Sequence, residues 1–151
     1  MIWPNLNISY SVDCTPSVEC TQYKYRVMWA FGSWEQKFSK LDFEYKEERP
    51  SDIHVWILPG TKYYCGGEEF GCALYKHEVG KYIRSVEIYL KPISPAWKFM
   101  QIAKHEIGHA LGLADIPEDL HVFETIMVNW FSKDTDISDP DIQRLKVNYQ
   151  E

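Results

Sequence analysis

The sequence lacks the features of several large classes of proteins. Its 151 residues contain no apolar run that approaches the roughly 20 residues of a membrane-spanning helix. They also contain no internal repeat, low-complexity tract or linker. We therefore expect a single domain that is long enough to bury a substantial core, and we expect no association with a membrane.

An excess of positive charge is missing as well. Lysine and arginine number 16 against 22 acidic residues, which gives a formal net charge of −6. Because surfaces that bind nucleic acid are basic, we expect no nucleic-acid partner. The first residues also lack the basic-then-apolar pattern of a signal peptide. Either the protein stays inside the cell, or Met1 was added to a mature sequence.

The four cysteines lack the C-x-x-C spacing of a zinc knuckle or of a thioredoxin-like site. They occur as two close pairs, Cys14 with Cys20 and Cys65 with Cys72. This spacing favours two local disulfides, although four cysteines allow three connectivities and four buried thiols are the alternative. Disulfides would indicate a secreted, oxidising location or a thermophilic host.

Aromatic residues, by contrast, are plentiful, with six Trp and ten Tyr, as is typical of a well-packed globular fold. Alternating polarity and short apolar runs predict five strands. The third of these is apolar enough to be central, and the fourth is expected at an edge. The predicted strands cover residues 6–12, 41–45, 53–58, 72–76 and 85–90.

Three helices are predicted from start signals and apolar periodicity. Thr15-Pro16 and Ser94-Pro95 each resemble an N-cap followed by proline at the first helical position. Ser138 and Asp141 have capping-box spacing before a third helix. The first helix carries an apolar stripe at three- and four-residue steps, formed by Tyr23, Val27, Ala30 or Phe31, Trp34 and Phe38. The second is expected to lie under the sheet through Phe99, Ile102, Ala103 and Leu111.

One stretch, residues 105–115, carries the residues of a metal site. Residues four apart share a helix face, so His105 and His109 can present two imidazoles to one metal ion. Glu106 projects beside them, near enough to act on a water bound to that metal. Gly112 can adopt a left-handed conformation, end the helix and bring Asp115 round as a third ligand. The stretch predicts a hydrolytic zinc site, and the alternative is an exposed helix that happens to carry two histidines.

Two further histidines lie outside this motif. His54 and His77 occur near Asp52 and Glu78. Their spacing is looser than that of known metal sites, so ordinary strand and loop histidines are the favoured interpretation over a second metal site.

The long motif resembles that of the metzincin metallopeptidases. Their pattern H-E-x-x-H-x-x-G-x-x-H/D is matched from His105 to Asp115, and residues 125–128 resemble their methionine turn, with Met127 beneath the metal. Within the clan, the chain is most similar to the matrixin catalytic domain. Residues 6–10, 30–34, 41–43 and 138–143 resemble its first strand, first helix, second strand and last helix, so the similarity spans nearly the whole chain.

The resemblance implies an α+β, zincin-like (metzincin) fold. Its parts would be a twisted five-stranded mixed sheet with one antiparallel edge strand, two long helices and a C-terminal helix. Residues 1–151 would form a single catalytic domain, with an upper part at 1–112 and a lower part, which holds the methionine turn and the final helix, at 113–151. We expect this domain to be a monomer.

The chain departs from the matrixin pattern in several ways. Asp115 stands where most metzincins have histidine, and snapalysin-type metzincins are similar here. His121 is the competing third ligand, but it lies too far past Gly112 for the turn of the family. Asn129, two residues after Met127, stands where matrixins have proline and astacins have tyrosine, in the wall of the specificity pocket. The chain shows no cysteine-switch propeptide, and the metal-binding loop of matrixins is shortened, so no clear motif supports calcium.

The implied activity is that of a zinc-dependent endopeptidase with one catalytic Zn²⁺. A metal-activated water would hydrolyse the peptide bond with Glu106 as the general base. The protein or peptide substrate would add to the edge strand, and the expected contacts are Ala73, Leu74, Tyr75, Val128, Asn129 and Trp130. The alternatives are a catalytically weak or inactive, zinc-stabilised protein-binding module and a zinc hydrolase of a non-peptide amide.

Overall fold

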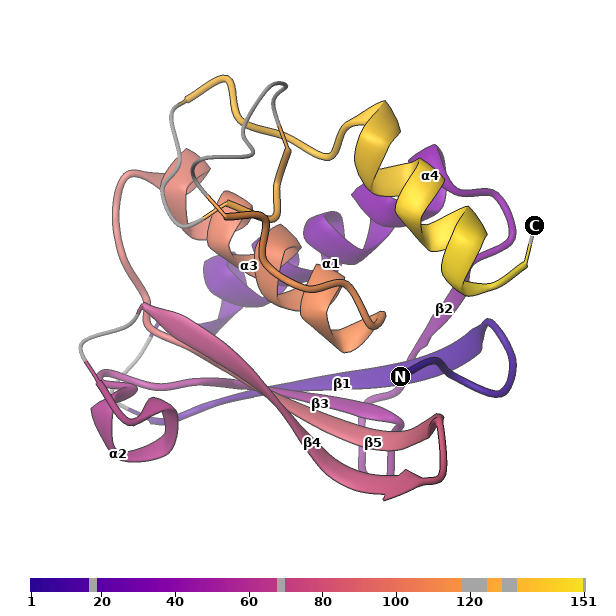
Figure 1. The fold of residues 1–151 in the computed structure, drawn as a ribbon. Coiled ribbons are helices and arrows are strands. Elements are labelled where there is room, and N and C mark those ends of the chain that lie inside the picture. The colour runs from indigo at the N-terminus through magenta and orange to yellow at the C-terminus, as the bar shows by residue number, and fades with distance from the viewer. Residues whose placement is uncertain (17–18, 68–69, 118–124, 129–132, 151) are drawn as a thin grey trace.

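The structure of the protein is a computed structural model that describes residues 1–16, 19–67, 70–117, 125–128 and 133–150. Figure 1 shows its helices and strands. In chain order they are β1 (Asn7–Cys14), α1 (Cys20–Lys37), β2 (Asp42–Tyr45), β3 (Ile53–Ile57), α2 (Lys62–Cys65), β4 (Gly71–Val79), β5 (Tyr82–Leu90), α3 (Ala96–Ala110) and α4 (Asp139–Asn148).

The five strands form one mixed sheet in the order β2-β1-β3-β5-β4. Neighbouring strands are parallel except for β4, which pairs with β5 in the antiparallel direction at one edge. Strand β3 occupies the centre, where Ile53, Val55 and Ile57 are fully buried. The predicted sheet, its central strand and its antiparallel edge strand are thus confirmed.

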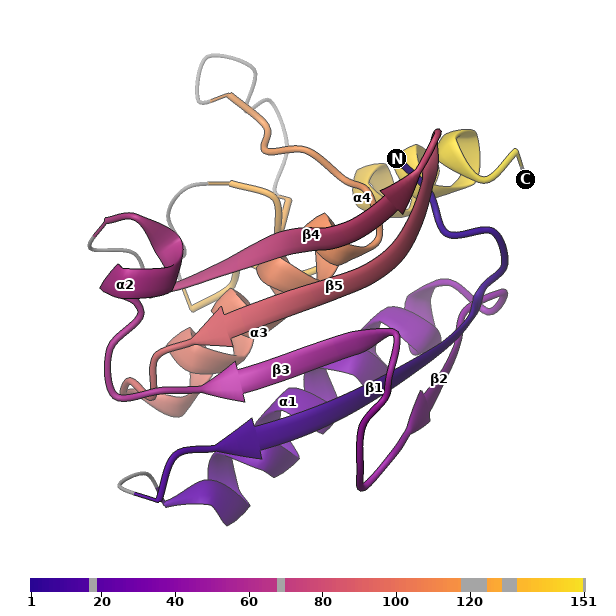
Figure 2. The same ribbon diagram turned by 90° about the horizontal axis from the view of Figure 1, so that it is seen from below.

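Helices α1, α3 and α4 lie on the same side of this sheet (Figures 1 and 2). The predicted stripe of α1 is buried against the sheet and α3 through Val27, Ala30, Phe31 and Trp34. The side chains expected to hold α3 under the sheet are also buried, namely Phe99, Ile102, Ala103 and Leu111. The helix that carries the metal motif is therefore fixed on one flank by the sheet and on the other by α1.

Both predicted helix starts with proline were wrong in detail. Helix α1 begins at Cys20, not after Thr15-Pro16, because the Thr15 backbone N–H donates to the Ile57 carbonyl (3.2 Å) and so extends the β1 pairing. Helix α3 begins at Ala96, and Pro95 itself is the N-cap in an extended conformation. The short helix α2 was not predicted.

Other local predictions are confirmed. The Asp141 carboxylate accepts a hydrogen bond from the Ser138 backbone N–H (3.0 Å) and forms the capping box of α4. Two disulfides join the cysteines in the predicted pairs, Cys14–Cys20 and Cys65–Cys72. None of the helices in the described ranges is both long and apolar enough to cross a membrane.

Candidate metal centre

The two histidines of the motif lie in the last turns of α3 and point at each other. Their Nε2 atoms are 3.1 Å apart, and His105 is only 8% exposed. The Asp115 carboxylate joins them, with Oδ1 at 3.2 Å from His105 Nε2 and at 3.0 Å from His109 Nε2. The three predicted ligands therefore converge on one point. They form the only cluster of three such side chains in the described parts of the chain.

The turn that brings Asp115 into this cluster is a Schellman motif. Gly112 has a φ of +99°, its N–H donates to the His109 carbonyl (2.9 Å), and the Leu113 N–H donates to the Gly108 carbonyl (3.0 Å). A Cβ at Gly112 would run into the Met1 carbonyl oxygen. The position therefore needs glycine both for its backbone conformation and for the close approach of the N-terminal segment.

Backbone carbonyls fix the orientation of both imidazoles. His105 Nδ1 is 2.7 Å from the Ile126 carbonyl oxygen, and His109 Nδ1 is 2.8 Å from the Leu113 carbonyl oxygen. Because a carbonyl can only accept, each Nδ1 carries the hydrogen, and in the neutral ring each Nε2 then presents a lone pair to the cluster.

The donor set fits zinc. Two nitrogens and one carboxylate oxygen lie 3.0–3.2 Å apart. Ligand atoms at about 2.0 Å from a tetrahedral ion would be about 3.3 Å apart. Three lone-pair donors at this separation repel one another, and a cation between them removes that repulsion. Three protein ligands also leave the fourth position that distinguishes a catalytic from a structural zinc site.

The electrostatics of the cluster favour a negative Asp115. Its hydrogen bond to His105 is the main cause that lowers the pKa of the Asp115 carboxyl. Burial alone would lower the pKa of His105, but the bond to Asp115 and the charge of Glu106 raise it overall. Burial and the neighbouring His105 lower the pKa of His109. The Asp115 carboxylate of the cluster therefore attracts positive charge.

The segment predicted to be the methionine turn lies against α3, at Gly108 and His105. Met127 is fully buried, and a Cβ at Gly108 would collide with its sulfur. The Ile116 N–H donates to the Met127 carbonyl (2.7 Å), which ties this turn to the segment after Asp115. Gly108, in the middle of the motif, is thus the residue that lets α3 approach the methionine.

Asp141 supports the site, although its place in the sequence did not indicate this role. Its fully buried carboxylate accepts from the Ile126 N–H (3.1 Å) and from the Thr125 hydroxyl, besides capping α4. The Ile126 carbonyl in turn orients His105. The capping-box spacing pointed to Asp141, but only as a helix start.

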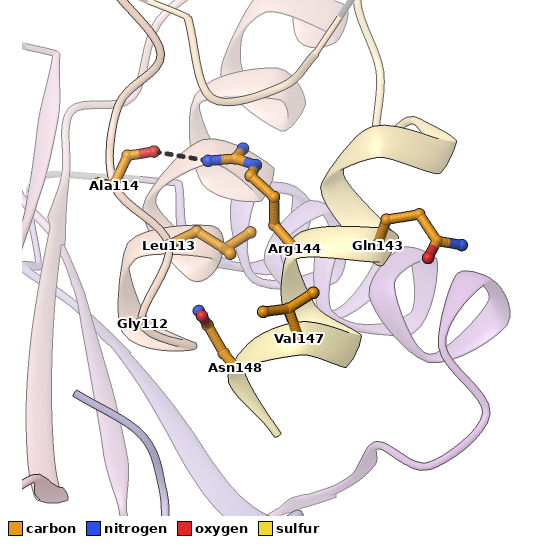
Figure 3. A pocket seen from close by; sticks show the side chains of 7 residues that line it. All are labelled: Gly112, Leu113, Ala114, Gln143, Arg144, Val147 and Asn148. Atoms are coloured by element: carbon orange, nitrogen blue, oxygen red, sulfur yellow. Dashed lines mark hydrogen bonds between the residues drawn. The ribbon is translucent and has the colours of Figure 1, made fainter. Parts of the chain in front are cut away.

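Arg144 connects this carboxylate to the ligand loop. Its guanidinium donates to Asp141 (2.9 Å) and to the Ala114 carbonyl (3.2 Å), next to Asp115. Figure 3 shows the hydrogen bond between Arg144 and the Ala114 carbonyl, beside a cavity of about 400 Å³ between the 112–114 turn and α4.

The remaining predicted residues lie near this centre to different degrees. Glu106 is 6% exposed, and its negative charge is one of the causes that raise the pKa of His105. Ala73, Leu74 and Tyr75 are half-buried in the edge strand β4, and the Tyr75 hydroxyl donates to the His109 carbonyl (2.7 Å). Val128 is buried. Asn129, Trp130 and the competing ligand His121 lie outside the described residues.

The suggestion of a second metal site at His54 and His77 finds no support in the structure. His54 is buried, with Nδ1 at 2.8 Å from the Ser11 hydroxyl and Nε2 at 3.0 Å from the Asp13 carboxylate. His77 lies exposed on β4. Neither residue belongs to a cluster of three metal ligands among the described residues.

The family model described as matrixin matches residues 2–150 of the chain. No curated protein matches the chain.

Proposed function

The chain belongs to the matrixin family of zinc-dependent metallopeptidases, which act on proteins or peptides, and we propose that it is an endopeptidase with zinc held by His105, His109 and Asp115. Glu106 is the proposed general base. One observation carries this proposal: three ligand atoms converge within 3.2 Å of one another beside a buried carboxylate.

The chemistry divides between the metal and Glu106. Zinc, when bound, supplies the positive charge that acidifies a water and polarises the substrate carbonyl. Glu106 adjoins His105 in the sequence and is buried, so it is suited to take a proton from the attacking water and return it to the leaving amine. Because two histidines and Asp115 supply the proposed ligands, Glu106 is not needed as a ligand.

The free edge of β4 is the proposed binding site of the substrate backbone. The Lys91 N–H donates to the Phe70 carbonyl (2.8 Å), and Cys72 lies opposite Tyr89. In an antiparallel ladder the bonded pairs alternate, so Ala73 and Tyr75 turn their backbone N–H and C=O groups away from β5. These groups can pair with an extended peptide, a mode that tolerates many side chains.

The cysteines argue against a purely structural zinc. A structural site usually closes its fourth position with Cys or His. All four cysteines of this chain are in disulfides, and the cluster in the described residues offers three ligands. The free edge of β4 similarly favours a peptide over a non-peptide amide. We further propose that residues 1–151 form one catalytic domain, with an upper part at 1–112 and a lower part at 113–151.

Substitution of Glu106 tests the proposal. Glu106→Gln and Glu106→Ala should retain the fold and one zinc per chain but cleave a denatured generic protein at least about 100-fold more slowly than the wild type, since general bases contribute 10²- to 10⁴-fold. Removal of zinc with a chelator should abolish wild-type cleavage, and added zinc should restore it. Undiminished cleavage by the zinc-loaded variants would refute the assigned base.

A further inference from the structure

Two carbonyls at the end of α3 have no backbone donor within the described ranges of the chain. The last carbonyls of any helix lack N–H groups one turn ahead. Here the Schellman motif supplies donors for two of these carbonyls. The Leu113 N–H donates to the Gly108 carbonyl, and the Gly112 N–H donates to the His109 carbonyl. The carbonyls of Ala110 and Leu111 remain, and both residues are fully buried.

Side chains from opposite ends of the sequence supply the missing donors. Trp3 Nε1 donates to the Ala110 carbonyl (2.7 Å), and the Tyr149 hydroxyl donates to the Leu111 carbonyl (2.8 Å). The two donors are linked, because the Trp3 backbone N–H donates to the Tyr149 hydroxyl (3.2 Å). Tyr75 adds a third donor, on the His109 carbonyl (2.7 Å). Three successive carbonyls thus each accept a side-chain hydrogen bond, from three different parts of the chain.

The N-terminal segment that delivers Trp3 is itself fixed in place. The Ile2 N–H donates to the Lys81 carbonyl (2.9 Å), and the Ile83 N–H donates to the Ile2 carbonyl (2.7 Å). In both ribbon views this segment runs near the end of α4 (Figures 1 and 2). Met1 then lies against Gly112, at the turn itself.

This turn determines where the second half of the metal centre lies. The Leu113 carbonyl orients His109 through Nδ1, and Asp115 follows two residues later. A shift of the carbonyls at 109–111 would move the Leu113 carbonyl and Asp115 relative to His105, which is anchored separately through Ile126. The distances between the ligands depend on both anchors.

We propose that Trp3, Tyr149 and Tyr75 are positioning residues of the metal centre. By donating to the final carbonyls of α3, they hold the turn that sets His109 and Asp115 for zinc. This inference rests on the proposed function, because it assumes that His105, His109 and Asp115 bind the metal.

The tyrosine hydroxyls are suited to this task. Burial raises the pKa of Tyr149 to about 12 and also raises the pKa of Tyr75. Both hydroxyls therefore keep their hydrogens at neutral pH and can donate to a carbonyl.

Four conservative substitutions test the inference. Trp3→Phe, Tyr149→Phe and Tyr75→Phe each remove one donor and keep most of the ring. Tyr89→Phe is the matched control, because Tyr89 is also buried and its hydroxyl donates to Glu87 of the same strand, away from α3. Each protein is prepared without metal and checked by circular dichroism and thermal unfolding. Its zinc dissociation constant is then measured by competition with a chromophoric chelator.

Loss of partners that orient metal ligands typically costs 10- to 100-fold in metal affinity. Trp3, Tyr149 and Tyr75 contact the backbone next to the ligands and not the ligand side chains, so we expect a smaller effect. The zinc dissociation constant should rise about 3- to 10-fold in each of Trp3→Phe, Tyr149→Phe and Tyr75→Phe. We expect a further rise when Trp3→Phe and Tyr149→Phe are combined, and no change beyond about twofold in Tyr89→Phe. The visible spectrum of the cobalt-substituted protein should shift in the same variants.

The outcomes separate the inference from the proposed function. If the folded variants lose thermal stability as Tyr89→Phe does but bind zinc as tightly as the wild type, the three residues are merely structural and the inference fails. Tyr149→Phe and Tyr75→Phe decide the matter if Trp3→Phe does not fold. If the wild type itself binds no zinc, the proposed function fails, and the inference fails with it.

Discussion

Asp115 is the residue on which the proposed ligand set depends most. As a ligand, its carboxylate would neutralise part of the charge of a bound zinc, which would then acidify water less than it would with a third imidazole. The structure brings Asp115 within 3.2 Å of both histidines, as the turn at Gly112 predicted. The competing ligand His121 lies outside the described residues.

Substitution of these two residues distinguishes the alternatives. Asp115→Ala removes a direct ligand, so zinc affinity should fall by more than the 10- to 100-fold that loss of an outer partner costs. His121→Ala should leave the affinity within about twofold of the wild type. Competition with a chelator measures both dissociation constants. The reverse pattern would make His121 the third ligand.

Gly108 tests the close contact between α3 and the methionine turn. Gly108→Ala places a methyl group against the Met127 sulfur and 3.1 Å from the Trp34 ring. Overpacking of this kind should lower the free energy of unfolding by about 1–3 kcal/mol. Gly32→Ala is the matched control, because it lies within α1 and nothing occupies the space around its Cβ. It should stabilise the protein by about 0.5–1 kcal/mol. Chemical denaturation of the metal-free proteins measures both, and a neutral Gly108→Ala would contradict the contact.

His54 gives the protein a dependence of stability on pH that is separate from the metal. Burial, aided by the positive charge of Arg49, lowers the pKa of His54 despite the nearby Asp13. Below about pH 6.5 the unfolded chain therefore binds a proton that the folded protein excludes, so the free energy of unfolding falls with falling pH.

His54→Gln should remove this contribution. The loss of unfolding free energy between about pH 7.5 and about pH 5.5 should be smaller in His54→Gln than in the wild type, whereas the exposed His77→Gln should behave like the wild type. Denaturant unfolding of the metal-free proteins provides the comparison. An equal pH dependence in all three proteins would show that His54 does not contribute.

At the scale of the elements, periodic patterns predicted the strands and long helices correctly, but the ends of these elements were predicted less well. The alternation of the strands and the stripe of α1 were correct because half-buried elements must repeat apolar residues with the period of their geometry. The predicted start of α1 was wrong because the Thr15 N–H donates to the carbonyl of Ile57, a residue 42 positions away. Helix α2 has four residues, too few to show a period. Strand β4 continues beyond the predicted residue 76 to Val79 through exposed polar residues.

Strand β4 also carries a test of substrate binding. Ala73→Pro removes an N–H that faces the free edge and leaves the bonds to β5 intact. If a peptide substrate pairs there, kcat/KM for a peptide should fall about 3- to 10-fold, the equivalent of one lost hydrogen bond. Leu74→Pro is the contrasting variant, because its N–H lies on the β5 side and its loss should destabilise the fold. Unchanged kcat/KM in folded Ala73→Pro would place the substrate elsewhere.

At the scale of the whole molecule, the proposed metal centre is supported by contacts that no local pattern could predict. His105, Glu106, His109 and Asp115 were predictable because they lie within eleven consecutive residues of the chain. Trp3 meets Ala110 across 107 positions, and Asp141 meets Ile126 across 15. Such side chains bond backbone groups, and the same residue types occur in many positions of a protein without this role. Their residue type alone therefore does not predict these contacts. Only the folded chain brings them to the site.

Titration of the metal-free wild type with zinc, followed at once by bound metal and by cleavage of a denatured protein, tests the central claim most directly. The proposed function predicts that both signals rise together and saturate at about one zinc per chain, and that Glu106→Gln binds the same zinc with at least about 100-fold less cleavage. Full zinc binding without cleavage by the wild type, or equal cleavage by Glu106→Gln, would contradict it.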